Sequence, residues 1–435
     1  MKRSVMFVLA ACVAMQVNAA DLLEIYRDAL INDAQFASAT AQLTAGKEKG
    51  PQGTANILPT VNLSGSTTYS NVDATLPSER SYGFNTNTYQ LQLSQPVFRW
   101  QNWINYKEGA LQVAVAEAQF QAARNDLALR AAQSYFDVLY AQDVLSSVQT
   151  LKFAAAEQLQ LAKKSFEVGT VTITDVNEAQ SKFDLAAAQE IAAQSDLEVK
   201  RQALSLLSGK PPRPLSGLRN GVQIMPPTPA AVEAWVSAAE KNNAAVQAST
   251  LNLEIAKRDV DKARAGHLPT VDAVATYSNS HAGNGSSGSP SLSRTAAVGL
   301  QLTVPLYAGG ATQSKVREAI ALADKATADL EAQKRTATQA ARQAFVGVSS
   351  GVAQVRGYEA ALVSGKSAVE SNKLGYEVGV RINIDVLNAQ SSLADTQQKL
   401  AKSRYDTIMS QLKLKAATGV IESADIEGVN SLLDK

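Results

Sequence analysis

The 435-residue chain is 45% hydrophobic and 19% charged, with a formal net charge of +1. A charge so close to zero excludes a strongly basic nucleic-acid-binding protein. One cysteine and two histidines provide neither a disulfide framework nor the ligand cluster of a metal site. We therefore expect no metal and no other cofactor, and we expect His267 and His281 on the surface or in loops.

Residues 1–19 have the features of a secretory signal sequence. Lys2 and Arg3 precede a short apolar run, and small residues follow it up to Ala19. We therefore expect cleavage after about Ala19 and export of the mature chain. The stretch "LAAC", which ends at Cys12, resembles a lipoprotein cleavage box and leaves lipidation of Cys12 as an alternative, although the apolar run before it is very short.

The rest of the chain is a tandem duplication with an offset of 210 residues. "FEVGTVTITDV" from Phe166 matches "YEVGVRINIDV" from Tyr376, and "LPT" from Leu58 recurs at the same offset. The offset falls to 209 between Pro96 and Pro305, which predicts a one-residue difference in a hairpin. A period this long is not that of a solenoid. We predict repeat one at 20–216, a linker at 217–230, repeat two at 231–420 and a C-terminal tail at 421–435.

Long stretches of each repeat are typical of helices. The stretch from Trp100 to Gly169 is rich in Ala, Gln and Leu without proline, and Val113, Phe120 and Leu127 follow a heptad spacing. This predicts a coiled-coil helix on the order of 100 Å long. We predict helices at 22–56, 100–169 and 175–207, and again at 231–266, 311–378 and 385–417. Gly50-Pro51 should kink the first of these helices or end it early.

Strands are predicted between these helices, in hairpins at 60–98 and 270–306. In "VNLSGSTTYS", Val61, Leu63, Thr67 and Tyr69 fall on one face and polar residues fall on the other. Three further segments alternate in the same way, so we expect four strands of about ten residues. A polar loop lies inside each hairpin, at 71–88 and at 281–295.

The strands suggest a membrane barrel. An isolated hairpin is not stable in water, whereas alternating strands of about 9 to 11 residues are typical of transmembrane barrels. Beyond the signal sequence there is no apolar run of about 18 residues, which excludes a helical span. Four strands cannot close a barrel, so several copies would have to contribute, and a water-filled pore favours about twelve strands over about eight. The alternative is a periplasmic coiled-coil protein with two solvent-facing hairpins.

The sequence contains no recognisable catalytic machinery. We find no set of nucleophile, base and orienting residue, no paired-carboxylate cleft and no phosphate-binding loop. "SGK" at Ser208 lacks the upstream glycine of a Walker motif. We predict that the protein is not an enzyme.

The ordered set "LPT", "QPVF", "FEVGTVTITDV", "HLPT", "VPLYAGG" and "YEVGVRINIDV" resembles the TolC family of outer-membrane channel proteins, from Asp21 to about Gly419. The resemblance implies a mixed fold, in which a homotrimer combines a transmembrane β-barrel of four strands per protomer with a coiled-coil helical tunnel. It implies location in the Gram-negative cell outer membrane, in contact with outer-membrane lipid and spanning into the periplasm.

The resemblance also implies a function. The chain would be the exit duct of a tripartite efflux pump or type I secretion system, partnered by a periplasmic adaptor (membrane fusion protein) and an inner-membrane RND, ABC or MFS transporter. No nucleic-acid partner is expected. The alternative function, from a different class, is a non-channel periplasmic coiled-coil scaffold or adaptor with binding hairpins.

The two repeated turns are the candidate site. Gly169 and Gly379 suit a helix C-terminus that needs positive φ, and Asp175 and Asp385 suit the first turn of the next helix, where an acid is also a common helix cap. In the family these turns lie at the periplasmic tip of the tunnel. By resemblance, a periplasmic gate would be formed by bonds of Asp175 and Thr174 with Tyr376 and Arg381. Phe166, which is equivalent to Tyr376, has no hydroxyl to donate.

Other roles come from the same resemblance. Asp385 would form an anionic ring in the lumen that favours cations, although Asn388 stands where the family pattern has a second acid. Gln158 would face Lys373 in the gate, where an acidic partner is expected. The barrel-to-tunnel linker would contain Pro59, Pro96, Pro269 and Pro305. Beside these prolines, Phe98, Trp100, Trp103 and Tyr307 would form an aromatic girdle or would pack against helices. The linker at 217–230 and the tail would form a belt around the tunnel.

Overall fold

The computed structural model describes residues 19–75, 79–219, 221–283, 289–419 and 421–434. Cys12 and the predicted signal sequence up to residue 18 lie outside the described residues. The chain divides into two compact units, and both repeats contribute to each. The first unit takes Met1–Ser38, Ala123–Asn243 and Ala337–Lys435, and the second takes Ala39–Ala122 and Ala244–Thr336.

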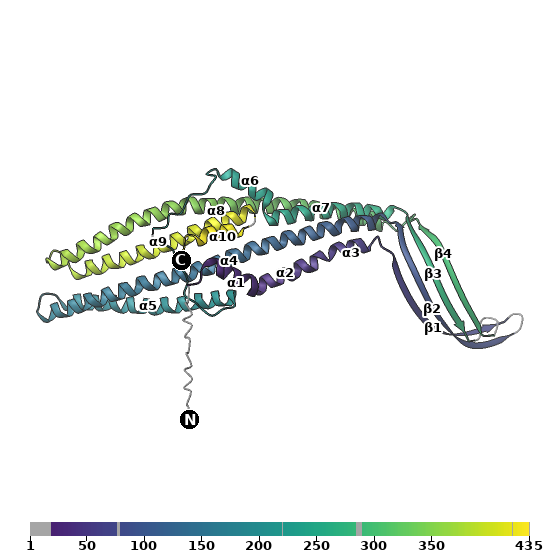
Figure 1. Ribbon diagram of the computed structural model, residues 1–435, viewed down its shortest axis with the longest axis horizontal. Coiled ribbons are helices and arrows are strands. Elements are labelled where there is room, and N and C mark those ends of the chain that lie inside the picture. Colours follow the sequence, from purple (N-terminus) through teal and green to yellow (C-terminus); the bar gives the residue numbers. More distant parts are fainter. Residues whose placement is uncertain (1–18, 76–78, 220, 284–288, 420, 435) are drawn as a thin grey trace, which may run out of the picture. The chain divides into compact units, whose positions relative to one another are not determined.

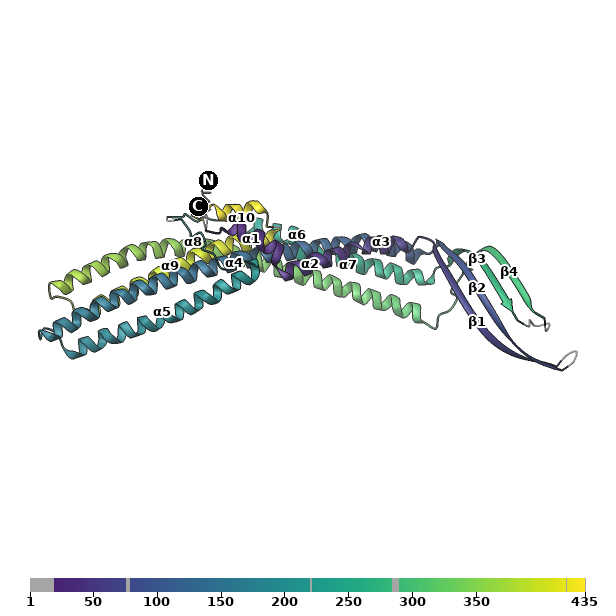
Figure 2. The ribbon, with the colours of Figure 1, turned by 60° about the horizontal axis from the view of Figure 1, so that its bottom comes forward.

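The first unit is built around two helical hairpins, which lie side by side in both views (Figures 1 and 2). One hairpin joins the later part of α4 (Trp100–Glu167) to α5 (Ile173–Ser208). The other joins the later part of α8 (Ala311–Glu377) to α9 (Asn383–Thr418). The predicted helices at 100–169, 175–207, 311–378 and 385–417 are thus confirmed to within two residues at each end.

The predictions of single helices at 22–56 and 231–266 were wrong. Asp33 separates α1 (Leu22–Asn32) from α2 (Ala34–Lys47), and Asn243 separates α6 (Val232–Asn242) from α7 (Ala244–Arg264). The two breaks are 210 residues apart, so they belong to the repeat. Both residues have extended backbone, with ψ of 117° at Asp33 and 127° at Asn243. Their side chains bond instead to Phe36 N and Ala417 O, because short polar side chains compete with the helical hydrogen bonds.

The predicted interruption at Gly50-Pro51 is confirmed, and its position has a physical cause. The helix stops after Lys47 and resumes as α3 (Lys49–Ala55). Pro51 lacks the N–H that would bond to the carbonyl of Lys47 four residues earlier, and its ring crowds that carbonyl. The break therefore falls just before the Gly-Pro pair rather than at it.

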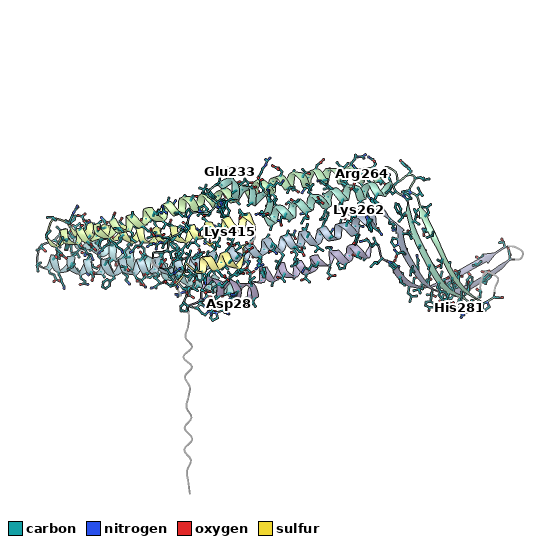
Figure 3. The ribbon with its side chains drawn as sticks, turned by 45° about the horizontal axis from the view of Figure 1, so that its top comes forward. Asp28, Glu233, Lys262, Arg264, His281 and Lys415 are labelled. Carbon is teal, nitrogen blue, oxygen red and sulfur yellow. The ribbon has the colours of Figure 1, made fainter. Side chains whose placement is uncertain are left out.

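The core of the first unit surrounds Tyr135 and Phe136 of α4, which are 0% and 1% exposed. The Tyr135 hydroxyl is satisfied in this apolar setting because it donates to Ser216 O at 2.6 Å and can also reach Ala20 O at 3.2 Å. Asp28 of α1, labelled in Figure 3, lies 2.6 Å from Lys210 Nζ. These bonds attach Ala20 and α1 to the segment that follows α5.

The linker at 217–230 lies against the C-terminal tail, which contains α10 (Ser423–Asn430). The amide of Arg219 donates to Leu432 O at 3.0 Å, and the amide of Asp434 donates to Gly217 O at 2.8 Å. Leu218 and Leu433 form a β-bridge between the same segments. The two segments predicted to form one belt are therefore in direct contact.

Helices α8 and α9 approach closely at two glycines one helical turn apart. A Cβ at Gly347 would lie 2.9 Å from Ser410 Oγ, and a Cβ at Gly351 would overlap Thr407 Oγ1. In repeat one the positions equivalent to Gly347 and Ser410 are Asp137 and Lys200, which are ion-paired at 3.6 Å. The same two positions thus hold an ion pair in one hairpin and a close glycine contact in the other.

The second unit contains an antiparallel sheet in the order β1-β2-β3-β4. Its strands are β1 (Thr60–Ala74), β2 (Arg80–Phe98), β3 (Thr270–Ala282) and β4 (Ser291–Thr303). Four strands were predicted correctly, but at 13 to 19 residues they are longer than ten. The first hairpin begins with Thr60 opposite Ser94 and the second with Thr270 opposite Thr303. These pairs confirm the one-residue difference, because the offset is 210 on one strand and 209 on the other.

Two ion pairs hold the second unit together near the sheet. Arg99, directly after β2, donates to both carboxylate oxygens of the buried Asp272 in β3, at 2.7 and 2.6 Å. Further along, Lys262 Nζ of α7 lies 2.9 Å from Glu108 Oε2 of α4, and Glu108 is 4% exposed. Lys262 is labelled in Figure 3. The η1 turn (Ala265–His267) connects α7 to β3. No helix among the described residues combines the length and the apolar composition needed to cross a membrane.

Candidate functional site

The two turns at the end of the helical hairpins have the same geometry. Gly169 has φ of 75° and Gly379 has φ of 80°, which confirms the predicted left-handed glycines. Thr170 N donates to Ser165 O at 2.8 Å, and Val380 N donates to Gly375 O at 2.9 Å, 210 residues later. Each long helix therefore ends in a Schellman-type bond across its glycine, which reverses the chain within a few residues.

Asp175 caps the helix that follows the first turn. Its Oδ2 accepts hydrogen bonds from Thr172 N and from Thr172 Oγ1, both at 2.8 Å, and Thr172 Oγ1 accepts from Asp175 N at 3.3 Å. This capping box confirms the interpretation of Asp175 as a helix cap. Asp385 also lies in the first turn of its helix, as predicted, but α9 has no side-chain cap.

In the second turn, Asp385 lies close to Arg381. Arg381 Nη1 is 3.7 Å from Asp385 Oδ2, and both side chains are partly exposed. Gly375 allows this arrangement, because a Cβ there would lie 2.7 Å from Arg381 Cγ. The aliphatic part of Arg381 therefore rests on the helix end. In repeat one, Val171 stands in place of Arg381 and cannot form an ion pair with Asp175.

Three of the predicted site residues gather between α4 and α8. Gln158, Lys373 and Tyr376 all line one cavity of about 680 Å³ there. Gln158 is 6% exposed, and its Oε1 has no hydrogen-bond partner among the described residues. Glu157 also lines this cavity and is an acidic residue that the sequence analysis missed.

The predicted bonds between the two turns are absent from the described part of this single chain. Asp175 binds Thr172, Arg381 lies beside Asp385, and Thr174 is exposed. Asp175 Oδ1 accepts no hydrogen bond from the described residues, so the carboxylate has an oxygen available for another donor. The gate contacts of Asp175 and Thr174 with Tyr376 and Arg381 remain predictions.

The four predicted linker prolines lie at the ends of the strands on the helical side of the sheet. Pro59 and Pro269 directly precede β1 and β3, Pro96 lies within β2 near its end, and Pro305 follows β4. Next to Pro96, the pairing of β2 with β3 shifts by one residue. Four nearby aromatic residues are exposed in the single chain: Phe98, Trp100, Trp103 and Tyr307.

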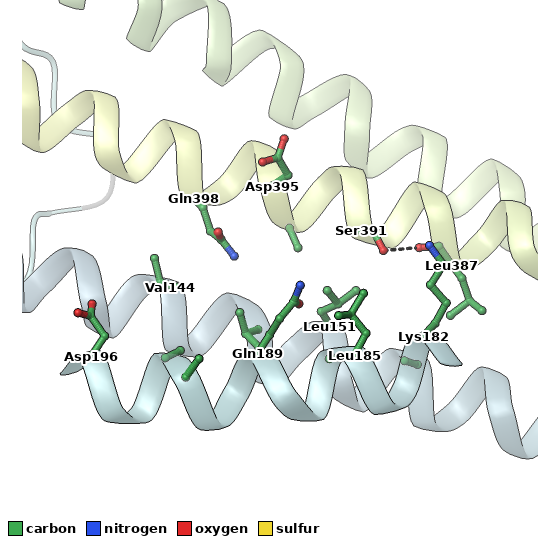
Figure 4. A pocket seen from close by; sticks show the side chains of 16 residues that line it. Val144, Leu151, Lys182, Leu185, Gln189, Asp196, Leu387, Ser391, Asp395 and Gln398 are labelled. Carbon is green, nitrogen blue, oxygen red and sulfur yellow. Dashed lines mark hydrogen bonds between the residues drawn. The ribbon is translucent and has the colours of Figure 1, made fainter. Parts of the chain in front are cut away.

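One apolar groove on the hairpins contains none of the predicted site residues. It encloses about 580 Å³ between α4, α5 and α9 (Figure 4). Val144 and Leu151 line it, and Lys182, Asp196 and Asp395 add charge. Ser391 Oγ donates to Leu387 O at 2.9 Å along one wall. His267 and His281 are exposed, as expected, and the described residues contain no cluster of possible metal ligands.

Solved structures define the class of protein. The fold matches that of the outer membrane protein VceC from Vibrio cholerae with a TM-score of 0.78, at 20% identity over 92% of this chain and 96% of that chain. It matches the CmeC outer membrane channel of Campylobacter jejuni with a TM-score of 0.81, at 18% identity over 100% of this chain and 98% of that chain. The fold is that of the outer-membrane channels.

The sequence comparisons identify the family. The family described as "Outer membrane efflux protein" matches residues 25–210 and 235–420, and the chain belongs to this family. The outer membrane protein TolC of Vibrio cholerae is 33% identical over 95% of this chain and 94% of its own length. The alkaline protease secretion protein AprF of Pseudomonas aeruginosa is 31% identical over 93% of this chain and 86% of its own length.

These findings confirm the function and location predicted from the sequence. The chain is an outer-membrane exit duct for efflux or type I secretion, in the outer membrane of a Gram-negative bacterium and extending into the periplasm. Its family consists of transport proteins rather than enzymes. The resemblance to the TolC family is likewise confirmed, at about 30% identity over nearly the whole chain.

Proposed function

We propose that three copies of this chain form one gated duct, with about twelve strands in a closed barrel. The observation that carries the proposal is the sheet itself. Strands β1 and β4 are both edge strands, so each leaves a row of backbone N–H and C=O groups unpaired. In lipid every such group must be paired, and only additional strands from other copies can do this.

The apolar residues of the sheet support a membrane position. Leu63 faces Leu91 across β1 and β2, and Leu300 faces Ala273 across β3 and β4. Leu63 and Leu300 are 76% and 75% exposed in the single chain. Outer-membrane lipid would cover this face. The alternative of a water-exposed scaffold would leave the same leucines in water, which costs about 25 cal/mol for each Å² of apolar surface.

The gate would lie at the two turns. Tyr376 and Arg381 would donate to Asp175, whose Oδ1 is not used by the helix cap, while Thr174 would accept from Arg381 and Gln158 would meet Lys373. Arg381 is well suited to this because its side chain is 58% exposed and its ion pair with Asp385 is long, at 3.7 Å. Asp385 would provide the anionic ring of the lumen. A periplasmic adaptor and an inner-membrane RND, ABC or MFS transporter would complete the assembly.

Native mass spectrometry of the detergent-purified protein tests the proposal. We expect a trimer, and we expect deletion of Val61–Val97 to abolish it because the remaining strands cannot close a barrel. The control is the parent chain with all four strands, purified and measured in the same way. A stable monomer with full strand content would refute the trimer.

A further inference from the structure

We propose that β4 of one copy pairs with β1 of the next copy in the same register in which β2 pairs with β3 inside one chain, with Gln301 of β4 directly opposite Ser66 of the next copy. Each such junction of two paired strands is called a seam below. This inference rests on the proposed trimer and adds the register of its strands. It follows from the duplication, because the chain already contains one junction between a second strand and a first strand of successive repeats.

The internal junction supplies the template. Strand β2 ends repeat one's hairpin, β3 begins that of repeat two, and they pair antiparallel with Gln92 opposite Thr276 and Ser94 opposite Val274. In a closed ring, β4 would pair with β1 of the next copy in the way that β2 pairs with β3. The same interaction can therefore occur at both junctions.

The two hairpins are similar enough for the template to be copied residue by residue. Their ladders run in step from Thr60–Ser94 and Thr270–Thr303 for 13 pairs. Throughout this range β1 and β3 differ by 210 residues and β2 and β4 by 209. Gln92 thus corresponds to Gln301, and Thr276 corresponds to Ser66. The copied seam runs from Thr295 opposite Val72 to Thr303 opposite Ser64.

The alternation of side chains agrees with this register. Residues that face each other across antiparallel strands lie on the same side of a sheet. The copied register sets Leu302 opposite Gly65 and Leu300 opposite Thr67, on the side that carries Leu63 and Leu91. A slip of one residue would turn the leucines of β4 to the polar side, so only slips of two residues compete.

The chain also distinguishes its internal seam from the copied one. The bidentate pair of Arg99 and Asp272 spans β2 and β3 at one end. At the copied seam, the equivalent residues are Ala308 and Asn62, which cannot form an ion pair. The internal seam is therefore specified by charge, and the seam between copies depends on backbone pairing and on the apolar side chains alone.

Disulfide cross-linking tests the register, because Cys12 is the sole cysteine and lies in the predicted signal sequence. Facing Cα atoms lie about 4.5–5.5 Å apart, within disulfide range, whereas a partner two residues away lies at about 7–8 Å. The test pair is Gln301→Cys with Ser66→Cys. The off-register controls combine Gln301→Cys with Ser64→Cys or with Thr68→Cys. The internal control is Gln92→Cys with Thr276→Cys.

After oxidation with a water-soluble oxidant, the test pair should give covalent dimers and trimers on denaturing gels. The internal control should give only cross-linked monomers, and the off-register pairs should react several-fold less. Native mass spectrometry of each variant before oxidation separates the two proposals. A trimer that cross-links best through Ser64→Cys or Thr68→Cys, or through none of the three, overturns the register and leaves the trimer standing. A monomer overturns both.

Discussion

Replacing Gly351 with alanine should destabilise the first unit, although alanine is normally the better helix former. The new Cβ would overlap Thr407 Oγ1 and lie 3.0 Å from its Cγ2 and 3.1 Å from its Cβ. Thr407 is 1% exposed and its hydroxyl donates to Ser403 O at 2.6 Å, so rotation of the side chain would break a buried hydrogen bond. Overpacking of this kind costs about 1–3 kcal/mol. Because the contact includes a Cβ, we take the upper end, and subtracting about 1 kcal/mol for helix propensity leaves about 2 kcal/mol.

Two variants control for the change in propensity. Gly357→Ala lies in the same helix, where a Cβ would meet nothing within 4 Å, and should stabilise the protein by about 0.5–1 kcal/mol. Thr407→Ala combined with Gly351→Ala removes the overlapping hydroxyl, so the double variant should lose less stability than the sum of the single variants.

Thermal unfolding of the detergent-solubilised protein, followed by circular dichroism at a helical wavelength, measures these effects. At about 2–4 °C per kcal/mol for a unit of this size, Gly351→Ala should lower the midpoint by about 4–8 °C. If Gly351→Ala melts with or above Gly357→Ala, then α8 and α9 do not pack as closely at Gly351 as the structure shows.

Three further predictions concern the site and the second unit. Replacing Tyr376 with Phe and Arg381 with Ser together should raise single-channel conductance in planar bilayers several-fold. Shielded hydrogen bonds to a carboxylate contribute about 1.5–3 kcal/mol each, and they would be lost in every copy. If the double variant conducts like the parent, both residues are only caps and surface contacts. Asp385→Ala should lower the cation preference, measured as a reversal potential in a salt gradient, and leave the closed state intact; an unchanged potential would place Asp385 outside the lumen. Burial raises the pKa of the Glu108 carboxyl although Lys262 opposes the shift, so the native protein binds this proton more tightly than the unfolded chain and loses stability as pH rises through the raised pKa. Glu108→Gln should therefore reduce the fall of the denaturation midpoint with rising pH in this range. An unaltered pH profile would contradict this prediction.

Local signals were enough to predict the long helices and the turns. Gly169 and Gly379 end α4 and α8 at the expected positions, because a left-handed residue after a helix is strongly biased to glycine. The breaks at Asp33 and Asn243 were missed although an asparagine directly precedes each, and two short polar residues in a row weaken a helix locally. Tertiary partners add to this local effect: Arg130 forms an ion pair with Asp33, and the carbonyl of Ala417 accepts a hydrogen bond from Asn243.

The parts of the site that depend on distant pairing could not be predicted. Arg99 and Asp272 are 173 residues apart, and they meet only because β2 pairs with β3 in one particular register. The sequence does not show why residue 375 is a glycine. The reason is the close contact with the Arg381 side chain, which leaves no room for a Cβ. Glu157 adjoins Gln158 in sequence, but that it shares a cavity with Lys373 depends on how α4 and α8 pack.

The ion pair between Arg99 and Asp272 has a consequence for the order of assembly. Strands β2 and β3 belong to one chain, so they meet at an effective concentration set by the intervening polypeptide and independent of how much protein the cell makes. In the proposed trimer, the junction between copies would have no such tether and would form by collision, at a rate that rises with concentration. At low expression, single chains with a completed four-stranded sheet should therefore accumulate first. Closure of the ring would then be the slow, concentration-dependent step.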